Sequence, residues 1–277
     1  MNNNYFYITP MIESFKVVPR IAQLYFPRIN WKGDLKGHMG NSDAFFFVVS
    51  GECCVIVDGR CHILRSGDLI FMPKGEMRSY FSMCSDLTLY EINFEAFIND
   101  IPWNKALNIS GERGQRMVHT DNPSYIARLF EECVRYEVNK AFMYDVIFTA
   151  NISLVIKEYL LKYTENKNLT KPFEDVVEYL EANIHKSLKI EDMASVCYMQ
   201  PTYFIKKFKA AMGDSPIVYF NKLKVYKAMF LLATTELSVL DVSRRVGVYD
   251  SSYFSKLFRS YANMTPREYK SKFWHHQ

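Results

Sequence analysis

The sequence has no apolar run that approaches the roughly 20 residues of a membrane-spanning helix. Its opening residues, MNNNYFYITP, do not combine a basic segment with an apolar one, as a secretion signal would. These two absences predict a cytoplasmic protein that does not enter a membrane.

Paired metal-binding motifs are also missing. The six cysteines include no C-x-x-C pair and no histidine at a matching distance, which argues against a structural zinc site. Cys53, Cys54 and Cys61 lie in apparent strands, so we expect buried, reduced thiols. We predict no cofactor.

The first part of the chain has no net positive charge, and the whole positive excess lies in the last part. Residues 1–171 hold 19 Lys and Arg against 19 Asp and Glu, whereas residues 172–277 hold 15 against 11, so the second segment carries the whole net charge of +4. Such an excess suits a polyanionic partner. Four charges alone do not separate nucleic acid from an ordinary solvated surface.

Residues 45–94 have the pattern of short strands. The apolar runs FFFVVS, CCVIV, RCHIL and LIFMP are separated by turn residues. Asp58-Gly59 predicts a two-residue hairpin turn, because such a turn needs positive φ at both central residues. With 277 residues, 49% of them hydrophobic, the chain has enough core material for one large domain or two ordinary ones. An antiparallel barrel or sandwich is the expected N-terminal fold.

After Pro123, apolar residues recur every three or four positions, which predicts two amphipathic helices within residues 124–163. The wide apolar face of this segment comprises Ile147, Ile152, Val155, Leu160 and Leu161. This face can pack against a second copy of the chain or against the chain's own barrel. The polar residues 164–171, followed by Pro172, predict a linker.

Two later stretches share one pattern at an offset of fifty residues. YFIKKFKAAMGDSPIVYF begins at Tyr203 and YFSKLFRSYANMTPREYK begins at Tyr253. Each copy predicts a compact helix, a break and a second helix, which is typical of a helix-turn-helix unit. A joining helix over residues 216–232 would be roughly 25 Å long at about 1.5 Å per residue. The two second helices would then lie about one DNA turn apart, and some bending of the DNA is expected.

The second helices have an inward and an outward face. Phe204 with Phe208, and Phe254 with Phe258, are expected to point inward, and the shared Tyr203 and Tyr253 are expected to help hold the two helices in one pose. The outward faces are small, polar or basic, as base edges and phosphates require. The residues predicted to contact DNA are Gln200, Pro201, Thr202, Ile205, Lys206 and Lys209 in the first unit and Ser251, Ser252, Ser255, Lys256 and Arg259 in the second.

One helix-turn-helix pattern is weak evidence for DNA binding, because many helical pairs mimic it. Two copies with matched spacing are stronger, since a stacking scaffold normally needs three or more repeats. A similarity to a known family is carried by Met193-Ala194, Tyr203-Phe204, Phe208-Lys209, Gly213, Ser215-Pro216, Tyr219, Ala228, Leu231-Leu232, Val246-Gly247-Val248, Ser252-Tyr253-Phe254-Ser255-Lys256, Phe258-Arg259, Thr265-Pro266 and Tyr269. Through them, residues 174–273 resemble the DNA-binding domain of the AraC/XylS transcriptional regulators.

Several positions depart from that family pattern. Asn263 stands where Gly is usual, although Asn also accepts a left-handed helix cap. Gln200 replaces a usual Ser cap, and Lys224 stands in the joining helix where Arg is common. These changes are expected to affect the operator sequence more than the function.

The N-terminal region is similar, more loosely, to the cupin-like sensor half of this family. The matching positions are His38, Gly51-Glu52, Gly59, Gly67-Asp68 and Pro73-Lys74-Gly75. In cupin enzymes, a His-x-His pair, a Glu and a later His hold a metal. Here His38 stands alone and Arg78 occupies the later position, and a guanidinium cannot ligate a cation. We therefore predict no metal site and no catalytic residues. The alternative interpretation, a cupin-type enzyme with a helical accessory domain, would need a set of metal ligands that this sequence lacks.

The mouth of such a barrel is a common small-molecule site. The predicted effector pocket comprises His38, Arg78, Tyr80 and Glu91, with Tyr90 as a further candidate. Arg78 could pair there with a carboxylate or phosphate, or hydrogen-bond a sugar. An Arg78 on the outer face of the barrel is equally consistent with the sequence, because the strand phase is not determined.

The sequence and the resemblance together predict an α+β multidomain fold. A cupin-like antiparallel β-barrel (1–120) precedes a helical dimerisation segment (121–164), a linker (165–173) and an all-α domain with two helix-turn-helix units joined by a long helix (174–277). We expect a bacterial transcription activator rather than an enzyme. Its expected partners are double-stranded DNA, a second copy of the chain, RNA polymerase and a small-molecule effector such as a sugar.

Overall fold

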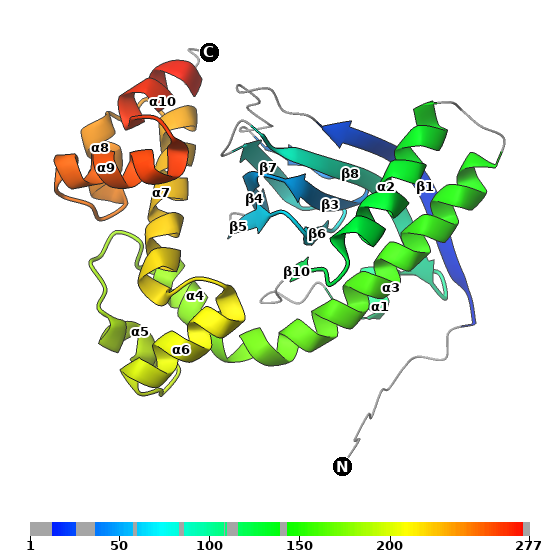
Figure 1. Cartoon of the computed structure of the whole chain (residues 1–277), viewed down its shortest axis with the longest axis horizontal. Coiled ribbons are helices and arrows are strands. Elements are labelled where there is room, and N and C mark those ends of the chain that lie inside the picture. The colour runs from blue at the N-terminus through cyan, green and yellow to red at the C-terminus, as the bar shows by residue number, and fades with distance from the viewer. Residues whose placement is uncertain are drawn as a thin grey trace.

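The computed structural model describes residues 13–25, 37–57, 60–82, 86–107, 109, 116–138 and 143–273. A β-rich N-terminal part and a helical C-terminal part lie side by side and are joined by one long helix (Figure 1). The predicted α+β class, with antiparallel sheets first and helices afterwards, is confirmed. No helix of the described residues is both long and apolar enough to cross a membrane.

Two antiparallel sheets form the N-terminal part. The strands are β1 (Phe15–Tyr25), β2 (His38–Met39), β3 (Asp43–Ser50), β4 (Glu52–Val57), β5 (Arg60–Arg65), β6 (Asp68–Met72), β7 (Met77–Ser82), β8 (Thr88–Ile98), β9 (Ile101–Pro102) and β10 (Met117–His119). One sheet has the order β1-β8-β3-β6-β10, with β9 paired to β8, and the other has the order β2-β7-β4-β5. Val57 lies opposite Arg60 in the β4–β5 pair, as the predicted hairpin requires. The predicted turn residues Asp58 and Gly59 lie outside the described residues.

The central strands β3 and β6 of the larger sheet are buried on both faces, which explains why they lack a polar face, whereas the edge strand β1 is partly exposed. On β3, Phe46 packs into the interior between the sheets, whereas Phe45 and Phe47 pack against helices. Because neighbouring side chains on a strand point in opposite directions, the run AFFFVV supplies both layers at once. The barrel interior is the cluster around Phe46, Val55 and Leu89.

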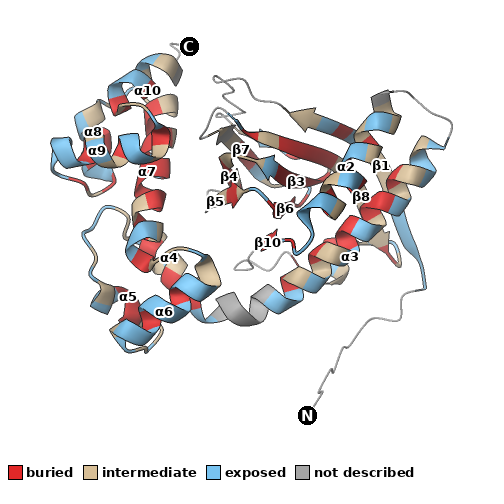
Figure 2. Ribbon diagram, viewed as in Figure 1, coloured by how far each residue is buried: buried red, intermediate tan, exposed pale blue. Residues whose placement is uncertain are grey.

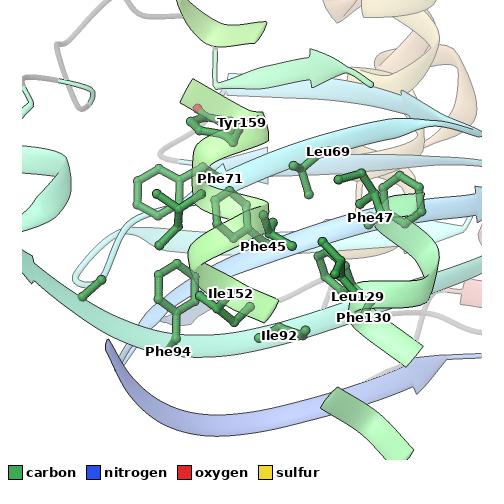
Figure 3. Close-up of a cluster of buried hydrophobic side chains, with 14 of the residues drawn as sticks. Phe45, Phe47, Leu69, Phe71, Ile92, Phe94, Leu129, Phe130, Ile152 and Tyr159 are labelled. Carbon is green, nitrogen blue, oxygen red and sulfur yellow. The ribbon is translucent and has the colours of Figure 1, made fainter. Parts of the chain in front are cut away.

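Helices cover the outer face of the larger sheet. They are α1 (Trp103–Ala106), α2 (Pro123–Val138) and α3 (Tyr144–Thr170). Figure 3 shows Leu129 and Phe130 from α2, and Ile152 and Tyr159 from α3, against sheet residues that include Phe45. The ring of Tyr159 lies 5.2 Å from that of Phe45, centroid to centroid. The barrel and these helices therefore share one hydrophobic core.

The connection to the C-terminal part is helical. Helix α3 continues through most of the polar segment 164–171 and ends at Thr170. The 3-10 turn η1 (Lys171–Phe173) follows directly. Polarity suggested a linker there, and the structure gives that segment a regular backbone. At about 1.5 Å per residue, the 27 residues of α3 extend roughly 40 Å.

The C-terminal part is entirely helical. Its helices are α4 (Glu174–Ala182), α5 (Ile190–Val196), α6 (Pro201–Met212), α7 (Pro216–Thr234), α8 (Val239–Arg245), α9 (Ser251–Ala262) and α10 (Pro266–Phe273). They form two clusters, one around Phe204 and Phe208 and the other around Phe254 and Phe258. Helix α7 contributes to both clusters, so it is the joining helix that the sequence predicts.

Candidate nucleic-acid interface

The first helix-turn-helix unit consists of α5 and α6. The Asp192 carboxylate accepts a hydrogen bond from the backbone N–H of Lys189 at 2.8 Å, which stabilises the start of α5. Pro201 occupies the first turn of α6, where its missing N–H is not needed. Gly213 follows α6 with φ of 79°, a left-handed conformation that glycine adopts without strain. The compact helix, the break and the second helix that the sequence predicts for this copy are thus present.

The second unit, α8 and α9, is capped by side chains at both starts. Ser238 Oγ accepts a hydrogen bond from the backbone N–H of Asp241 at 3.1 Å. Asp250 Oδ1 accepts one from the backbone N–H of Tyr253 at 2.8 Å. Asn263 ends α9 with φ of 54°, so the asparagine takes the left-handed cap in place of glycine, as predicted. The second helices of the two units thus end in the same left-handed conformation, whereas their starts differ, with Pro201 at the start of α6 and the Asp250 side-chain cap at the start of α9.

Each unit buries its phenylalanine pair. The Phe208 ring lies 5.4 Å from the rings of Phe204 and Phe173, and the Phe258 ring lies 5.4 Å from that of Tyr269. The predicted inward orientation of all four phenylalanines in α6 and α9 is confirmed. Because these rings fix the inner face, they also determine which residues remain outside.

The outer faces of α6 and α9 are exposed (Figure 2). The exposed predicted residues are Gln200, Thr202, Ile205, Lys206, Lys209, Ser251, Ser252, Lys256 and Arg259. Pro201 and Ser255 are half-buried at the edges of the same faces. The structure therefore collects the predicted residues of each unit on one accessible helix face, and their contact with DNA stays a prediction.

Four tyrosines extend these exposed faces. Tyr203 and Tyr253 occupy matched positions and are 52% and 51% exposed, so among the shared aromatic residues the phenylalanines, and not these tyrosines, form the buried inner face. Tyr198 and Tyr249, in the turns before α6 and α9, are 98% and 72% exposed. The missed signal was the Tyr-Phe pair itself, because adjacent residues of a helix cannot share one face.

The predicted effector residues gather at one end of the barrel. The His38 backbone pairs with Arg78, and the exposed His38 ring lies 6.2 Å from the ring of Tyr80. Glu91 is buried in the interior and accepts a hydrogen bond from the Asn93 amide at 2.9 Å. Burial and the nearby Glu91 carboxylate raise the pKa of Tyr25, which lines the same interior. We call the side chains of Tyr25, Tyr80, Glu91 and Asn93 the interior polar cluster of the barrel.

Arg78 lies inside the barrel and is 2% exposed, which resolves its strand phase. Its Nη2 donates to the backbone carbonyls of Ser42, Met72 and Pro73 at 2.6–2.7 Å. Burial lowers the pKa of the guanidinium, although Glu91 and other carboxylates act against this shift. Arg78 thus holds two loops of the barrel, and its buried Nε has no hydrogen-bond partner among the described residues.

Tyr90 does not belong to this cluster. Its ring lies 5.8 Å from that of Phe130 on α2, on the opposite side of the larger sheet from Glu91. Adjacent residues of a strand point to opposite faces, so Glu91 and Tyr90 cannot both line the barrel. Tyr90 is a core residue under the helices.

The outer face of the smaller sheet packs against the C-terminal part. Cys54, Ile56 and Ile63 join the hydrophobic cluster of α7, α9 and α10. Around it, Arg65 Nη2 donates to Asp214 Oδ2 at 3.0 Å, and the Tyr226 hydroxyl donates to Glu52 Oε1 at 3.3 Å. We call these contacts the docking interface. It leaves the outer faces of α6 and α9 exposed.

The predicted dimerisation face is mostly used within the chain. Ile152 and Val155 are fully buried against the barrel, and Leu160 packs against the same core. Leu161 of that predicted face is exposed, and together with Val146 and Leu154 it forms an exposed apolar stripe on α3, next to exposed Met143 just before the helix. If α3 binds a second copy, this stripe is the available surface.

A metal site in the barrel would take its ligands from His, Cys, Asp and Glu side chains. No group of three His, Cys, Asp or Glu side chains among the described residues could hold a metal ion. The carboxylates near Arg78 are committed to neighbouring donors. Asp43, for example, accepts hydrogen bonds from the Trp103 indole at 3.0 Å and the Lys74 backbone N–H at 2.8 Å.

Comparison with known families agrees with this division of the chain. Residues 193–272 match the family described as a helix-turn-helix domain, and residues 32–87 match the cupin domain family. Both matches fall where the structure places the corresponding elements.

Known proteins similar to this chain are transcriptional regulators. The lactose operon transcription activator of Staphylococcus xylosus is 31% identical over 230 residues, which cover 82% of each chain. The regulatory protein PocR of Salmonella typhimurium is 30% identical over 125 residues, so this chain spans 41% of PocR's length. Among solved structures, ToxT from Vibrio cholerae O395 is 16% identical, with a TM-score of 0.42 over 94% of this chain and 98% of ToxT.

Proposed function

This chain belongs to the AraC/XylS family of transcriptional regulators, and we propose that its two helix-turn-helix units read adjacent major grooves on one side of a DNA duplex. The observation that carries the proposal is the matched pair of outer faces on α6 and α9. Both are exposed and bear small, polar or basic side chains, while the phenylalanines behind them are buried. An exposed helix of this composition can present hydrogen-bond donors to base edges and phosphates.

The roles of the charged residues follow from their positions. Lys206 and Lys256 are fully on the outer faces and are assigned to bases or adjacent phosphates. Lys209 and Arg259 lie one helical turn later and are assigned to the DNA backbone. Thr202 and Ile205 differ from Ser252 and Ser255 at matched positions, so the two units would read different half-site sequences.

The DNA assignment is tested with the full-length protein. Selection from a random DNA library should return two conserved blocks about one helical turn apart. Lys206→Ala and Lys256→Ala should each weaken binding to the selected DNA about tenfold or more, and loss of a phosphate contact should also reduce the salt slope. Lys157→Ala, at an exposed lysine of α3 that binds Glu158, is the matched control and should bind normally. Unchanged affinity in both α6 and α9 variants would refute the assignment.

The barrel is proposed to bind a small polar effector, such as a sugar, and the chain to activate transcription through RNA polymerase. Support for the effector class comes from the polar side chains Tyr25, Tyr80 and Glu91, which lie in the barrel interior together with Arg78. The name of the Staphylococcus relative, a lactose operon activator, also favours a sugar and an activating role.

Calorimetric titration with a panel of monosaccharides and disaccharides tests the effector proposal. Glu91→Gln and Tyr80→Phe should lower the affinity for the ligand that binds, because the first replaces a carboxylate acceptor oxygen with an amide donor and the second removes a hydroxyl from the interior polar cluster. Tyr90→Phe, on the other side of the sheet, should bind as the wild type does. Binding that is unaffected by the first two substitutions would remove the pocket from the proposal.

Dimerisation is proposed through the exposed stripe of α3. Leu154→Glu and Leu161→Glu place charges on that stripe and should shift the protein from dimer to monomer in sedimentation experiments at micromolar concentration. Ile21→Glu, at an exposed apolar residue of β1, controls for adding a charge elsewhere. A wild-type protein that sediments as a strict monomer would exclude this part of the proposal.

A further inference from the structure

Lys224 lies at the boundary between the two helix-turn-helix units. Along α7, Phe220 and Leu223 pack in the first cluster, with Phe204 and Phe208. Val225 and the residues after it pack in the second cluster, with Phe254 and Phe258. Lys224 therefore occupies the one position of α7 at which the chain passes from one core to the other, and it is 4% exposed.

Its ammonium group connects the two units. Nζ donates a hydrogen bond to the backbone carbonyl of Lys186 at 2.8 Å, in the loop between α4 and α5. It donates another to the carbonyl of Gly247 at 3.1 Å, in the turn between α8 and α9. It also lies 4.6 Å from the ring of Phe220. One carbonyl lies in the loop that leads into the first unit, the other lies within the second unit, and the donor belongs to the helix between the units.

The same loop and turn touch directly at Gly247. Its φ of +67° is left-handed, and a Cβ at this position would lie 2.4 Å from the backbone carbonyl carbon and oxygen of His185. No side chain fits at position 247, so the turn between α8 and α9 packs directly against the loop between α4 and α5. Ser243 supports the turn from behind through a hydrogen bond from its hydroxyl to the carbonyl of Val248.

Burying a lysine is costly when it has no ionic partner. None of the ion pairs found among the described residues includes Lys224, and burial lowers its pKa to about 8. A methionine of similar length could fill such a site without that cost. The charge-assisted hydrogen bonds to two carbonyls offset part of the desolvation cost of the ammonium group. Unlike apolar packing, they also fix the direction of the contact as well as its distance.

We infer that Lys224 is a positioning residue that sets the orientation of the two helix-turn-helix units relative to each other, and with it the spacing between their DNA half-sites. This inference rests on the proposed reading of two grooves. A joining helix alone fixes the distance between the units, whereas the Lys224 contacts and the Gly247–His185 contact hold the rotation about that helix.

Selection from a random DNA library, with the full-length protein, measures this spacing directly. The wild type should return two blocks at one spacing. Lys224→Met should return the same blocks with spacings spread over a few base pairs, and should bind the single-spacing DNA about tenfold more weakly. Lys224→Arg keeps the charge and the donors and should restore the single spacing. Lys227→Met, at an exposed lysine of the same helix, is the matched control.

The outcomes separate this inference from the proposed function. If the wild type selects no two-block sequence, the proposed function fails. If the wild type does, but Lys224→Met keeps one spacing and binds within twofold of the wild type, Lys224 is not the positioning residue. Should circular dichroism show that Lys224→Met does not fold, Gly247→Ala keeps the lysine and separates the loop from the turn. A single, unchanged spacing in a folded Gly247→Ala variant would overturn the inference equally.

Discussion

At the scale of single residues, adjacent aromatic side chains of α6 and α9 point to opposite faces of the helix. Phe204, Phe208, Phe254 and Phe258 are all buried, and the residues directly before two of them, Tyr203 and Tyr253, are about half exposed. An aromatic pair in the sequence thus contains one residue for the core and one for the surface. The difference has direct consequences for stability.

Phe208→Ala should lower the free energy of unfolding by about 3–5 kcal/mol, because a fully buried ring is replaced by a cavity. Tyr203→Ala, on the other face of the same helix, should change it by less than about 1 kcal/mol. Urea denaturation followed by circular dichroism measures both. Equal losses for the two variants would contradict the assigned faces.

Lys224 should give a measurable pH dependence. Its folded-state pKa of about 8 lies below the ordinary value of 10.5, so between these pH values the unfolded chain binds more protons. The buried charge is therefore destabilising below pH 8, and stability should rise as the pH increases from 8 to 10.5. The stability difference between the wild type and Lys224→Met, measured at pH 7 and pH 10, should shift in favour of the wild type. A difference that is independent of pH would contradict the lowered pKa.

At the scale of elements, helix ends are defined by local chemistry. The caps of α6, α8 and α9 use Gly213, Ser238 and Asn263 in roles that their side chains, or the lack of one, dictate. Such features were predictable because a cap depends on a few residues adjacent in the sequence. The long α3 was less predictable, since its polar C-terminal turns resemble a linker when tertiary context is absent.

The helix caps should respond to substitution in opposite directions. Gly213→Ala should destabilise the protein by about 1 kcal/mol, because a Cβ is unfavourable at positive φ while the space around it is open. Asn263→Gly should leave stability unchanged or raise it by a few tenths of a kcal/mol, since glycine adopts the same conformation more readily. Thermal denaturation of both variants is the measurement, and a stabilising Gly213→Ala would disprove the reasoning.

At the scale of the whole molecule, β4 separates the barrel interior from the helical C-terminal part, and each of its two faces packs against one of them. Val55 packs into the barrel interior, next to the interior polar cluster, while Cys54 and Ile56 pack against the cluster of α7, α9 and α10. A shift of this strand would therefore act on both parts of the chain. The docking interface thus physically connects the barrel to the DNA-binding helices.

Alkylation of Cys54 should report whether this interface is closed. In the native protein the thiol is fully buried, so labelling by N-ethylmaleimide should be slow. Ile56→Glu, on the outer face of the same strand, should open the interface and accelerate Cys54 labelling at least about tenfold, because a carboxylate is costly in an apolar contact. Peptide mass spectrometry locates the label, and buried Cys133, which packs between the barrel and its helices, should stay protected. Unchanged protection of Cys54 would argue against the docking interface.

The barrel illustrates which parts of the site escape prediction. His38, Arg78, Tyr80 and Glu91 were expected near one another, and they are. Two points were not decided by the sequence. The buried guanidinium of Arg78 serves the loop carbonyls, and Tyr90 faces the helices instead of the interior. Strand phase depends on pairing between distant strands, which a local pattern cannot supply.

The sequence by itself determined the helix-turn-helix units, their caps and their buried phenylalanines, because these depend on spacings of a few residues and were repeated twice. The antiparallel barrel followed in the same way from turn residues between apolar runs. Only the tertiary structure decided the burial of Lys224 between the units, the use of α3 against its own barrel and the docking of Cys54 on the helical part. Those contacts join residues far apart in the chain, and they stabilise the protein only when both contacting segments have already folded.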